Sequence, residues 1–317
     1  MQRHAESMTI TGTFHDGQAM VHPRTRVIDY VTLMKPELTL LSMLSALCGY
    51  YMGSTDSLHV IGFVHTAIGT TLLGGGVGAL NMFIERDYDA MMKRTERRPL
   101  PSGRLLPRHA LLFGLVLSII GIVELMTFTN ELTGVLAIAT FVSYIFIYTP
   151  AKRRTEYSTL LGGIPGSLPP LIGWTAARGS LDLEGWVLFA ILFCWQMPHF
   201  YGLAWMYRKD YARAGYKMLT VVDPTGKRSS RHTLLFTLGL FPATMLTSML
   251  ALTGTLFAIG ATVLNIIFLL YAIRLILLTS ESGADNSMAV TATARRLFFA
   301  SLWYLPSLMI LMCISKR

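Results

Sequence analysis

The residues best suited to chemistry lie in one short segment that directly follows a long apolar run. Asn81, Glu85 and Asp89 are spaced four residues apart, so a continuous helix would place all three side chains on one face. Hard oxygen ligands of this kind suit Mg2+. Basic residues follow in the same loop, among them Arg98, and cations suit a phosphate that shares the metal. The segment therefore indicates chemistry on a diphosphate at a membrane surface.

A simpler interpretation of this segment is a solvated helix end, in which neighbouring acidic and basic side chains pair. Asn81 stands at the end of an apolar run, however, and polar groups at membrane depth are costly and tend to be functional. We therefore favour binding of Mg2+ and diphosphate over the solvated helix end.

A second basic cluster ends a later apolar run. Tyr148 is followed by Lys152, Arg153 and Arg154, and cations at the mouth of a span could clamp a phosphate. The alternative is a basic anchor at the membrane surface, which accounts for Arg154 adequately. Lys152 and Arg153 are the stronger candidates because the acidic segment lies on the same predicted side of the membrane.

A third polar group lies inside an apolar run, where Gln196 and His199 flank Pro198 and Asp210 follows. Proline kinks a helix and frees backbone carbonyls. Polar groups that face lipid are disfavoured, so this kink predicts a cavity. The alternative for His199 is a buried neutral imidazole that is hydrogen-bonded to a neighbouring helix.

Composition places these groups in a membrane protein. Of the 317 residues, 52% are hydrophobic and 14% are charged, whereas soluble domains carry about 25% charged residues. Backbone groups in lipid must find internal partners, so the expected fold is all-α. We predict one polytopic bundle of about nine transmembrane helices around a cytoplasm-facing central cavity. The predicted spans are residues 38–53, 60–82, 109–128, 132–149, 157–177, 185–206, 233–252, 255–273 and 297–314.

The distribution of basic residues orients this bundle. All but three of the 27 Lys and Arg residues fall in the N-terminal tail or in connections after even-numbered spans. The positive-inside rule makes that side cytoplasmic, so the N-terminus should lie inside and the C-terminus in the periplasm. The net charge of +9 then reflects topology, and no nucleic-acid partner is expected. Residues 1–28 should form a flexible cytoplasmic tail, and residues 29–317 the transmembrane domain.

Together these motifs resemble the UbiA-type intramembrane prenyltransferases, from about Lys35 to Leu311. Within that family they are most similar to the protohaem IX farnesyltransferase branch. Two departures are visible: Glu85 stands where an aspartate is usual, and Asp210 stands alone where the wider family has a pair of aspartates. The motifs that carry the resemblance are Asn81-x-x-x-Glu85-x-x-x-Asp89, Tyr148-x-x-x-Lys152-Arg153, Gln196-Met197-Pro198-His199-Phe200 and Asp210-Tyr211.

The resemblance implies transfer of a farnesyl group from farnesyl diphosphate to a vinyl group of haem B, with addition of water, giving haem O and diphosphate. Mg2+ is the implied cofactor and haem B is a substrate. The implied setting is the bacterial cytoplasmic (inner) membrane, with haem-A synthesis or terminal-oxidase assembly proteins as candidate partners. His199 is expected to orient haem or to ligate its iron. The implied catalytic residues are Asn81, Glu85, Asp89, Lys152, Arg153 and Asp210, the metal ligands Asn81, Glu85, Asp89 and Asp210, and the substrate-binding residues Arg98, Tyr148, Gln196 and His199.

Two alternatives remain open at this point. A UbiA-type enzyme that prenylates an aromatic acid or a quinone precursor would share Asn81 and Asp89 but should lack the pattern at residues 196–200. A transporter of an anionic solute would fit a broken span at residues 157–177 and the basic loops. It gives no reason for three aligned oxygen ligands.

Overall fold

The computed structural model describes the chain from Pro23 to Arg317, except for residue 56 and residues 282–286. The predicted tail, residues 1–28, therefore lies outside the described residues up to residue 22, and residues 23–28 already belong to the first helix. The helices are α1 (Pro23–Leu33), α2 (Pro36–Gly53), α3 (Val60–Asp89), α4 (Pro107–Phe128), α5 (Glu131–Val142), the π-helical turn η1 (Ser143–Tyr148), α6 (Thr149–Arg154), α7 (Ser158–Arg178), α8 (Leu183–Met206), α9 (Arg208–Arg213), α10 (Leu219–Val222), α11 (Lys227–Met249), α12 (Thr255–Glu281) and α13 (Ser287–Ile314).

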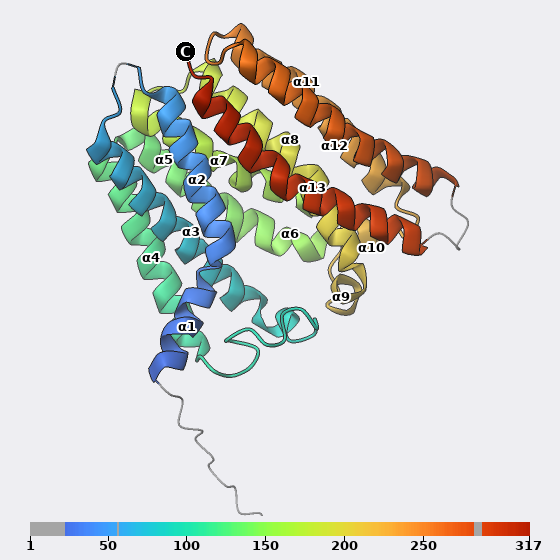
Figure 1. The fold of residues 1–317 in the computed structure, drawn as a ribbon. Helices are drawn as coiled ribbons and strands as arrows, with labels where there is room; N and C mark the ends of the chain where they lie inside the picture. The colour runs from blue at the N-terminus through green and yellow to red at the C-terminus, as the bar shows by residue number, and fades with distance from the viewer. Residues whose placement is uncertain (1–22, 56, 282–286) are drawn as a thin grey trace, which may run out of the picture.

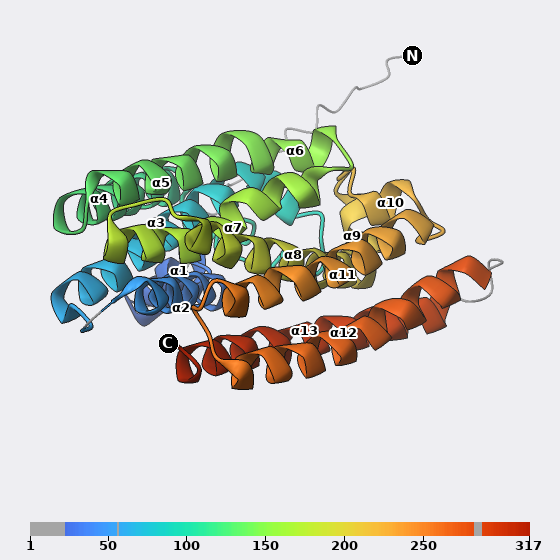
Figure 2. The same cartoon turned by 90° about the horizontal axis from the view of Figure 1, so that it is seen from above.

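The long helices run side by side in one bundle (Figure 1). From above, α5 and α6 lie on one side and α12 and α13 on the other, with α7 and α8 between them (Figure 2). At one end of the bundle Lys316 Nζ donates to the backbone oxygens of Tyr51 and Ser54 at 2.5 and 2.6 Å. At the opposite end the loop after α3, α6, α9 and α10 come together. That end carries the predicted site.

The all-helical membrane fold that we predicted is confirmed. Among the described residues, fewer than the nine predicted spans are both long enough and apolar enough to cross a membrane. By length and composition, six helices of the described chain could each cross a membrane, and the bent pair of residues 27–33 and 36–53 would make a seventh. α7 and α11, which correspond to two of the nine predicted spans, are not among them. Both nevertheless pack within the bundle, α7 against α2 and α8, and α11 against α8 and α12.

The expectation that residues 157–177 form a broken span is wrong, because α7 is one continuous helix with Pro165, Pro169 and Pro170 inside it. Close packing holds it in place. A Cβ atom on Gly173 would lie 1.7 Å from the carbonyl oxygen of Ala46 in α2. Only glycine permits the two backbones to approach this closely. α7 is therefore a structural wall of the bundle.

The break between α1 and α2 brings a cation to the functional end. α1 and α2 meet at an angle of 54°, and Lys35 at the break has φ 50° and ψ 65°, the left-handed conformation. Pro36 follows and disfavours the right-handed helical conformation at Lys35. A left-handed conformation costs a non-glycine residue on the order of 1–3 kcal/mol. The surrounding contacts must therefore hold Lys35 in place.

Candidate active site

The last two turns of α3 present the predicted oxygen ligands on one buried face. The helix continues unbroken to Asp89, so Asn81, Glu85 and Asp89 stack as the four-residue spacing predicts. Their exposed fractions are only 0%, 5% and 1%. Two buried carboxylates in a membrane protein require compensating charge. A solvated helix end does not explain this arrangement.

Each of these three side chains is held by one cation from a different part of the chain. Lys35 Nζ lies 2.5 Å from Asn81 Oδ1, at the break between α1 and α2. Lys152 Nζ, in α6, donates to Glu85 Oε1 at 2.7 Å. In the loop after α3, Arg98 Nη1 donates to Asp89 Oδ2 at 2.7 Å. Three cations thus stand directly beside three buried oxygen-bearing side chains.

The donor set fits Mg2+ by its chemistry. Amide and carboxylate oxygens are hard ligands. Asp89 Oδ1 is buried and has no hydrogen-bond partner among the described residues, so one carboxylate oxygen is left for a ligand. Asn81 Nδ2 donates to Thr149 Oγ1 at 3.1 Å, which directs Oδ1 of the amide away from Thr149. Asn81, Glu85 and Asp89 are therefore the residues that would hold the ion.

Local helix geometry positions the second cluster. The π-helical turn η1 precedes α6, and such turns are frequent at functional sites. It places Tyr148 beside Lys152, whose Nζ lies 4.7 Å from the centre of the Tyr148 ring. Arg153 points elsewhere. Its guanidinium lies 4.2 Å from the centre of the Tyr88 ring and bonds the Tyr88 hydroxyl.

Gln196 and His199 are not in the acidic cluster. Gln196 Nε2 donates to Gly163 O at 2.8 Å and to Ser167 Oγ, which joins α8 to α7. On another face of α8, His199 Nδ1 lies 2.8 Å from Ser301 Oγ of α13, and the imidazole stacks on Trp195. These contacts match the buried, hydrogen-bonded imidazole that we considered as the alternative, and a haem-binding role for His199 stays a prediction.

Asp210 lies at the same end of the bundle but in separate surroundings. It is on α9, and its Oδ1 is 3.3 Å from Arg213 Nη1. α9 is held to the loop after α3, because Arg94 lies 5.1 Å over the Tyr207 ring and Arg213 Nη1 contacts Met91 O at 3.5 Å. In the described chain, no three His, Cys, Asp or Glu side chains form a group that could hold a metal. Asp210 as a metal ligand stays a prediction.

Two residues near the cluster were missed by the sequence analysis. In the sequence, Lys35 only marks the start of the region that resembles the family. It lies 46 residues from Asn81, so no helical or strand spacing predicts their contact. Tyr216 is 3% exposed, and its hydroxyl has no hydrogen-bond partner among the described residues. Its loop is anchored by a bond from Lys217 N to Lys152 O at 2.9 Å. Burial raises the pKa of the Tyr216 phenol, so the hydroxyl remains a donor. The feature that singles out Tyr216 is its buried hydroxyl without a partner among the described residues, and the sequence does not show this feature.

Comparison with known proteins finds relatives that match almost the whole chain. The profile of the UbiA prenyltransferase family matches residues 42–303. The chain is 42% identical to the protohaem IX farnesyltransferase of Solibacter usitatus over 297 residues, which cover 91% of this chain and 98% of the relative. It is also 42% identical to the enzyme of the same name from Salinibacter ruber, over 90% of this chain and 98% of the relative.

Solved structures share the fold at low sequence identity. A digeranylgeranylglyceryl phosphate synthase is similar with a TM-score of 0.74 and 15% identity, over 92% of this chain and 98% of that one. A UbiA homologue from Archaeoglobus fulgidus, bound to DMAPP and Mg2+, is similar with a TM-score of 0.61 and 14% identity, over 88% of this chain and 99% of that one. The fold and the family profile agree, and the chain belongs to the UbiA prenyltransferase family.

Proposed function

We propose that the protein transfers a farnesyl group from farnesyl diphosphate to a vinyl group of haem B, giving haem O and diphosphate. The observation that carries the proposal is the row of Asn81, Glu85 and Asp89, each beside its own cation. The proposed acceptor and prenyl length follow from relatives that are 42% identical over almost their whole length. An anionic-solute transporter would not need this row of oxygens.

The chemistry begins with cleavage of the allylic C–O bond. The bonding electron pair leaves with the diphosphate, and positive charge develops on the farnesyl group. Mg2+ held by Asn81, Glu85 and Asp89 would neutralise charge on the diphosphate. Lys35, Lys152 and Arg98 are close enough to turn from the ligand oxygens to phosphate oxygens and to stabilise the same charge.

The vinyl group of haem B then attacks the allylic carbon and forms the new C–C bond. Water adds to the cation left on the former vinyl group and loses a proton, which gives a hydroxyl group and balances the reaction. Apolar helices around the farnesyl chain would keep water away from the earlier allylic cation.

The remaining predicted residues have supporting roles in this proposal. Asp210 approaches from α9 as a ligand or positioning acid, and Tyr148 orients Lys152. Arg153 meets diphosphate after leaving Tyr88. Gln196 shapes the acceptor side by holding α8 against α7, and His199 orients haem or ligates its iron.

We place the protein in the bacterial cytoplasmic (inner) membrane, with the N-terminus cytoplasmic and the C-terminus periplasmic. The basic loops at the site end support this orientation through the positive-inside rule. Haem-A synthesis or terminal-oxidase assembly proteins are the proposed protein partners, because such proteins would consume haem O.

The deciding experiment is mass analysis of haem extracted after purified protein is incubated with farnesyl diphosphate, haem B and Mg2+. We expect haem O and an equal amount of diphosphate, and neither when Mg2+ is chelated. A parallel reaction supplies an aromatic acid or quinone precursor in place of haem B. Prenylation of that acceptor alone, or solute flux without diphosphate release, would replace the proposal by one of its alternatives.

A further inference from the structure

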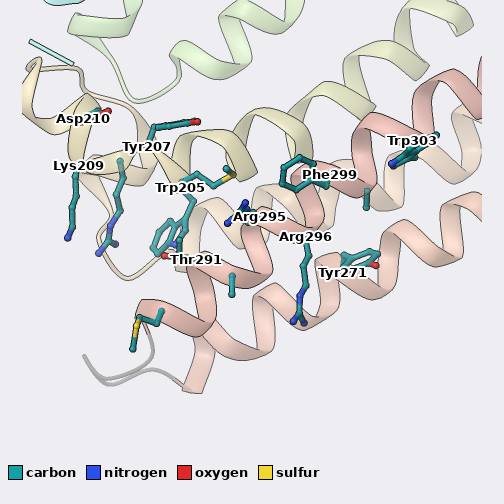
Figure 3. Close-up of a pocket in the computed structure, with 15 residues that line it drawn as sticks. Trp205, Tyr207, Lys209, Asp210, Tyr271, Thr291, Arg295, Arg296, Phe299 and Trp303 are labelled. Atoms are coloured by element: carbon teal, nitrogen blue, oxygen red, sulfur yellow. The ribbon is translucent and has the colours of Figure 1, made fainter. Parts of the chain in front are cut away.

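A cavity of about 1150 Å3 lies between the end of α8, α9, α12 and α13, at the same end of the bundle as the acidic cluster (Figure 3). Ligand pockets typically have about 300–1,000 Å3, so this one can take a large molecule. Among the acids and bases of the proposed active site, Asp210 alone lines it. None of the bond-making or bond-breaking steps of farnesyl transfer explains why the protein has this cavity.

The cavity wall is strongly cationic. Arg208, Lys209, Arg295 and Arg296 all line it. Among the side chains that the structure describes, no carboxylate forms an ion pair with any of these four. The carboxylate of Asp210 is directed to Arg213 at 3.3 Å. Guanidinium groups that have no carboxylate partner among the described residues suit carboxylate or phosphate ligands, which they bind in a bidentate manner.

The same wall is rich in flat aromatic surface. Trp205, Tyr207, Phe299 and Trp303 line the cavity, from α8 and its end on one side and from α13 on the other. The guanidinium of Arg208 lies 4.7 Å from the centre of the Trp205 ring. The guanidinium of Arg295 lies 5.7 Å from the centre of the Phe299 ring. Aromatic walls topped by cations suit a planar apolar ligand with anionic groups at one edge.

We propose that this cavity binds haem B, with its propionates on Arg295 and Arg296; the inference rests on the proposed farnesyl transfer. In protohaem the vinyl groups lie on the edge of the macrocycle opposite the propionates. Anchoring the propionates on α13 leaves the vinyl edge free to face α9. Tyr207 lies in the cavity wall and also under Arg94, which comes from the loop after α3. The vinyl edge of haem in the cavity would thus point toward the loop that follows the acidic cluster, where the farnesyl group would have to meet it.

An anionic phospholipid headgroup is the competing occupant, since basic pockets between helices on the cytoplasmic side bind such lipids. Aliphatic lipid chains would not need the aromatic lining. The volume and the flat walls therefore favour the tetrapyrrole.

The test measures haem B binding to purified protein by absorption titration, without farnesyl diphosphate or Mg2+. The double variant Arg295→Ala, Arg296→Ala should raise the Kd for haem B at least about tenfold, because two charge-assisted hydrogen bonds are lost. The matched control is Arg274→Ala, which removes an exposed arginine on α12 outside the cavity lining and should leave the Kd unchanged. Haem B dimethyl ester, which lacks both carboxylates, should bind wild type and double variant equally weakly.

Binding of farnesyl diphosphate with Mg2+ serves as the folding check and should be the same in wild type and double variant. If the double variant does not fold, the comparison of haem B with its dimethyl ester on wild-type protein still decides. The inference is overturned if the ester binds wild type as tightly as haem B does, or if a folded double variant keeps the wild-type Kd. Loss of bound anionic phospholipid with an unchanged haem Kd makes this a lipid site and also overturns it. Haem that binds through the arginines without haem O formation overturns only the proposed function.

Discussion

The ammonium nitrogen of Lys35 lies 2.5 Å from Oδ1 of Asn81, although 46 positions separate them in the chain. Lys152 and Arg98 contact Glu85 and Asp89 in the same way. Lys152 and Arg98 neutralise the two buried carboxylates, and Lys35 donates a hydrogen bond to the amide oxygen of Asn81. With Mg2+ and diphosphate bound, we expect the oxygens to turn to the metal and the cations to the phosphate.

Replacing Asp89 by asparagine should lower the rate of diphosphate release about 10²–10³-fold, as expected for loss of one preorganised electrostatic group. The shape of the side chain is kept, so the protein should remain folded. The rate is measured at saturating farnesyl diphosphate and haem B with excess Mg2+. Asp87→Asn is the matched control, because the Asp87 side chain is 74% exposed and its loss should change little. Equal rates in the two variants would contradict the assignment of Asp89.

Lys35→Met should reduce kcat/KM for farnesyl diphosphate about 100-fold, because one buried cation next to the leaving group is removed. The KM for haem B should not change. The control is Lys93→Met, which removes an exposed lysine from the loop after α3. If Lys35→Met instead raises only the KM for haem B, then Lys35 serves the acceptor and not the diphosphate.

Tyr216→Phe should stabilise the metal-free protein slightly, since an unpaired buried hydroxyl costs free energy. The same change should weaken farnesyl diphosphate binding about tenfold, because we expect the Tyr216 hydroxyl, which has no partner among the described residues, to donate a hydrogen bond to the diphosphate. The raised pKa of Tyr216 means that its proton is retained at neutral and mildly alkaline pH, so this effect should not depend on pH there. Thermal melting and a binding titration measure the two effects. Unchanged affinity would leave Tyr216 as a packing residue alone.

If His199 ligates the haem iron, His199→Gln should change the absorption spectrum of bound haem B. His199 does not line the cavity proposed above for haem, so ligation would require haem to bind deeper between α8 and α13. Ser301 Oγ donates its single proton to Phe298 O at 2.5 Å, so it must accept from His199 Nδ1. That bond leaves the lone pair of His199 Nε2 free to meet haem. Ser301→Ala keeps the imidazole but removes its orientation, and should change the spectrum less. An identical spectrum and an identical Kd for haem B in His199→Gln would rule out ligation.

Local sequence patterns were sufficient to predict the long helices and the helix face that carries Asn81, Glu85 and Asp89. Apolar runs predicted the long helices because lipid requires a nearly uniform apolar surface. The four-residue spacing predicted that Asn81, Glu85 and Asp89 share a face because helical periodicity depends only on neighbours. Pro169 and Pro170 led to the wrong prediction of a break in α7. The low helix propensity of proline is a local property, and close packing against α2 overrides it.

The partners of that face were decided by tertiary structure. Arg98 returns to Asp89 only because its loop folds back, where Arg104 Nε also bonds Asp29 Oδ1 at 2.9 Å. Gln196 contacts α7 and His199 contacts α13, although both lie on α8, and Asp210 pairs with Arg213 on α9. The sequence does not show which helix packs against each of these side chains. The amino-acid sequence by itself determined that Asn81, Glu85 and Asp89 share one face of a helix. Only the packing of distant helices decided which cation stands beside each of them, since electrostatic pairing depends on distance in space rather than along the chain.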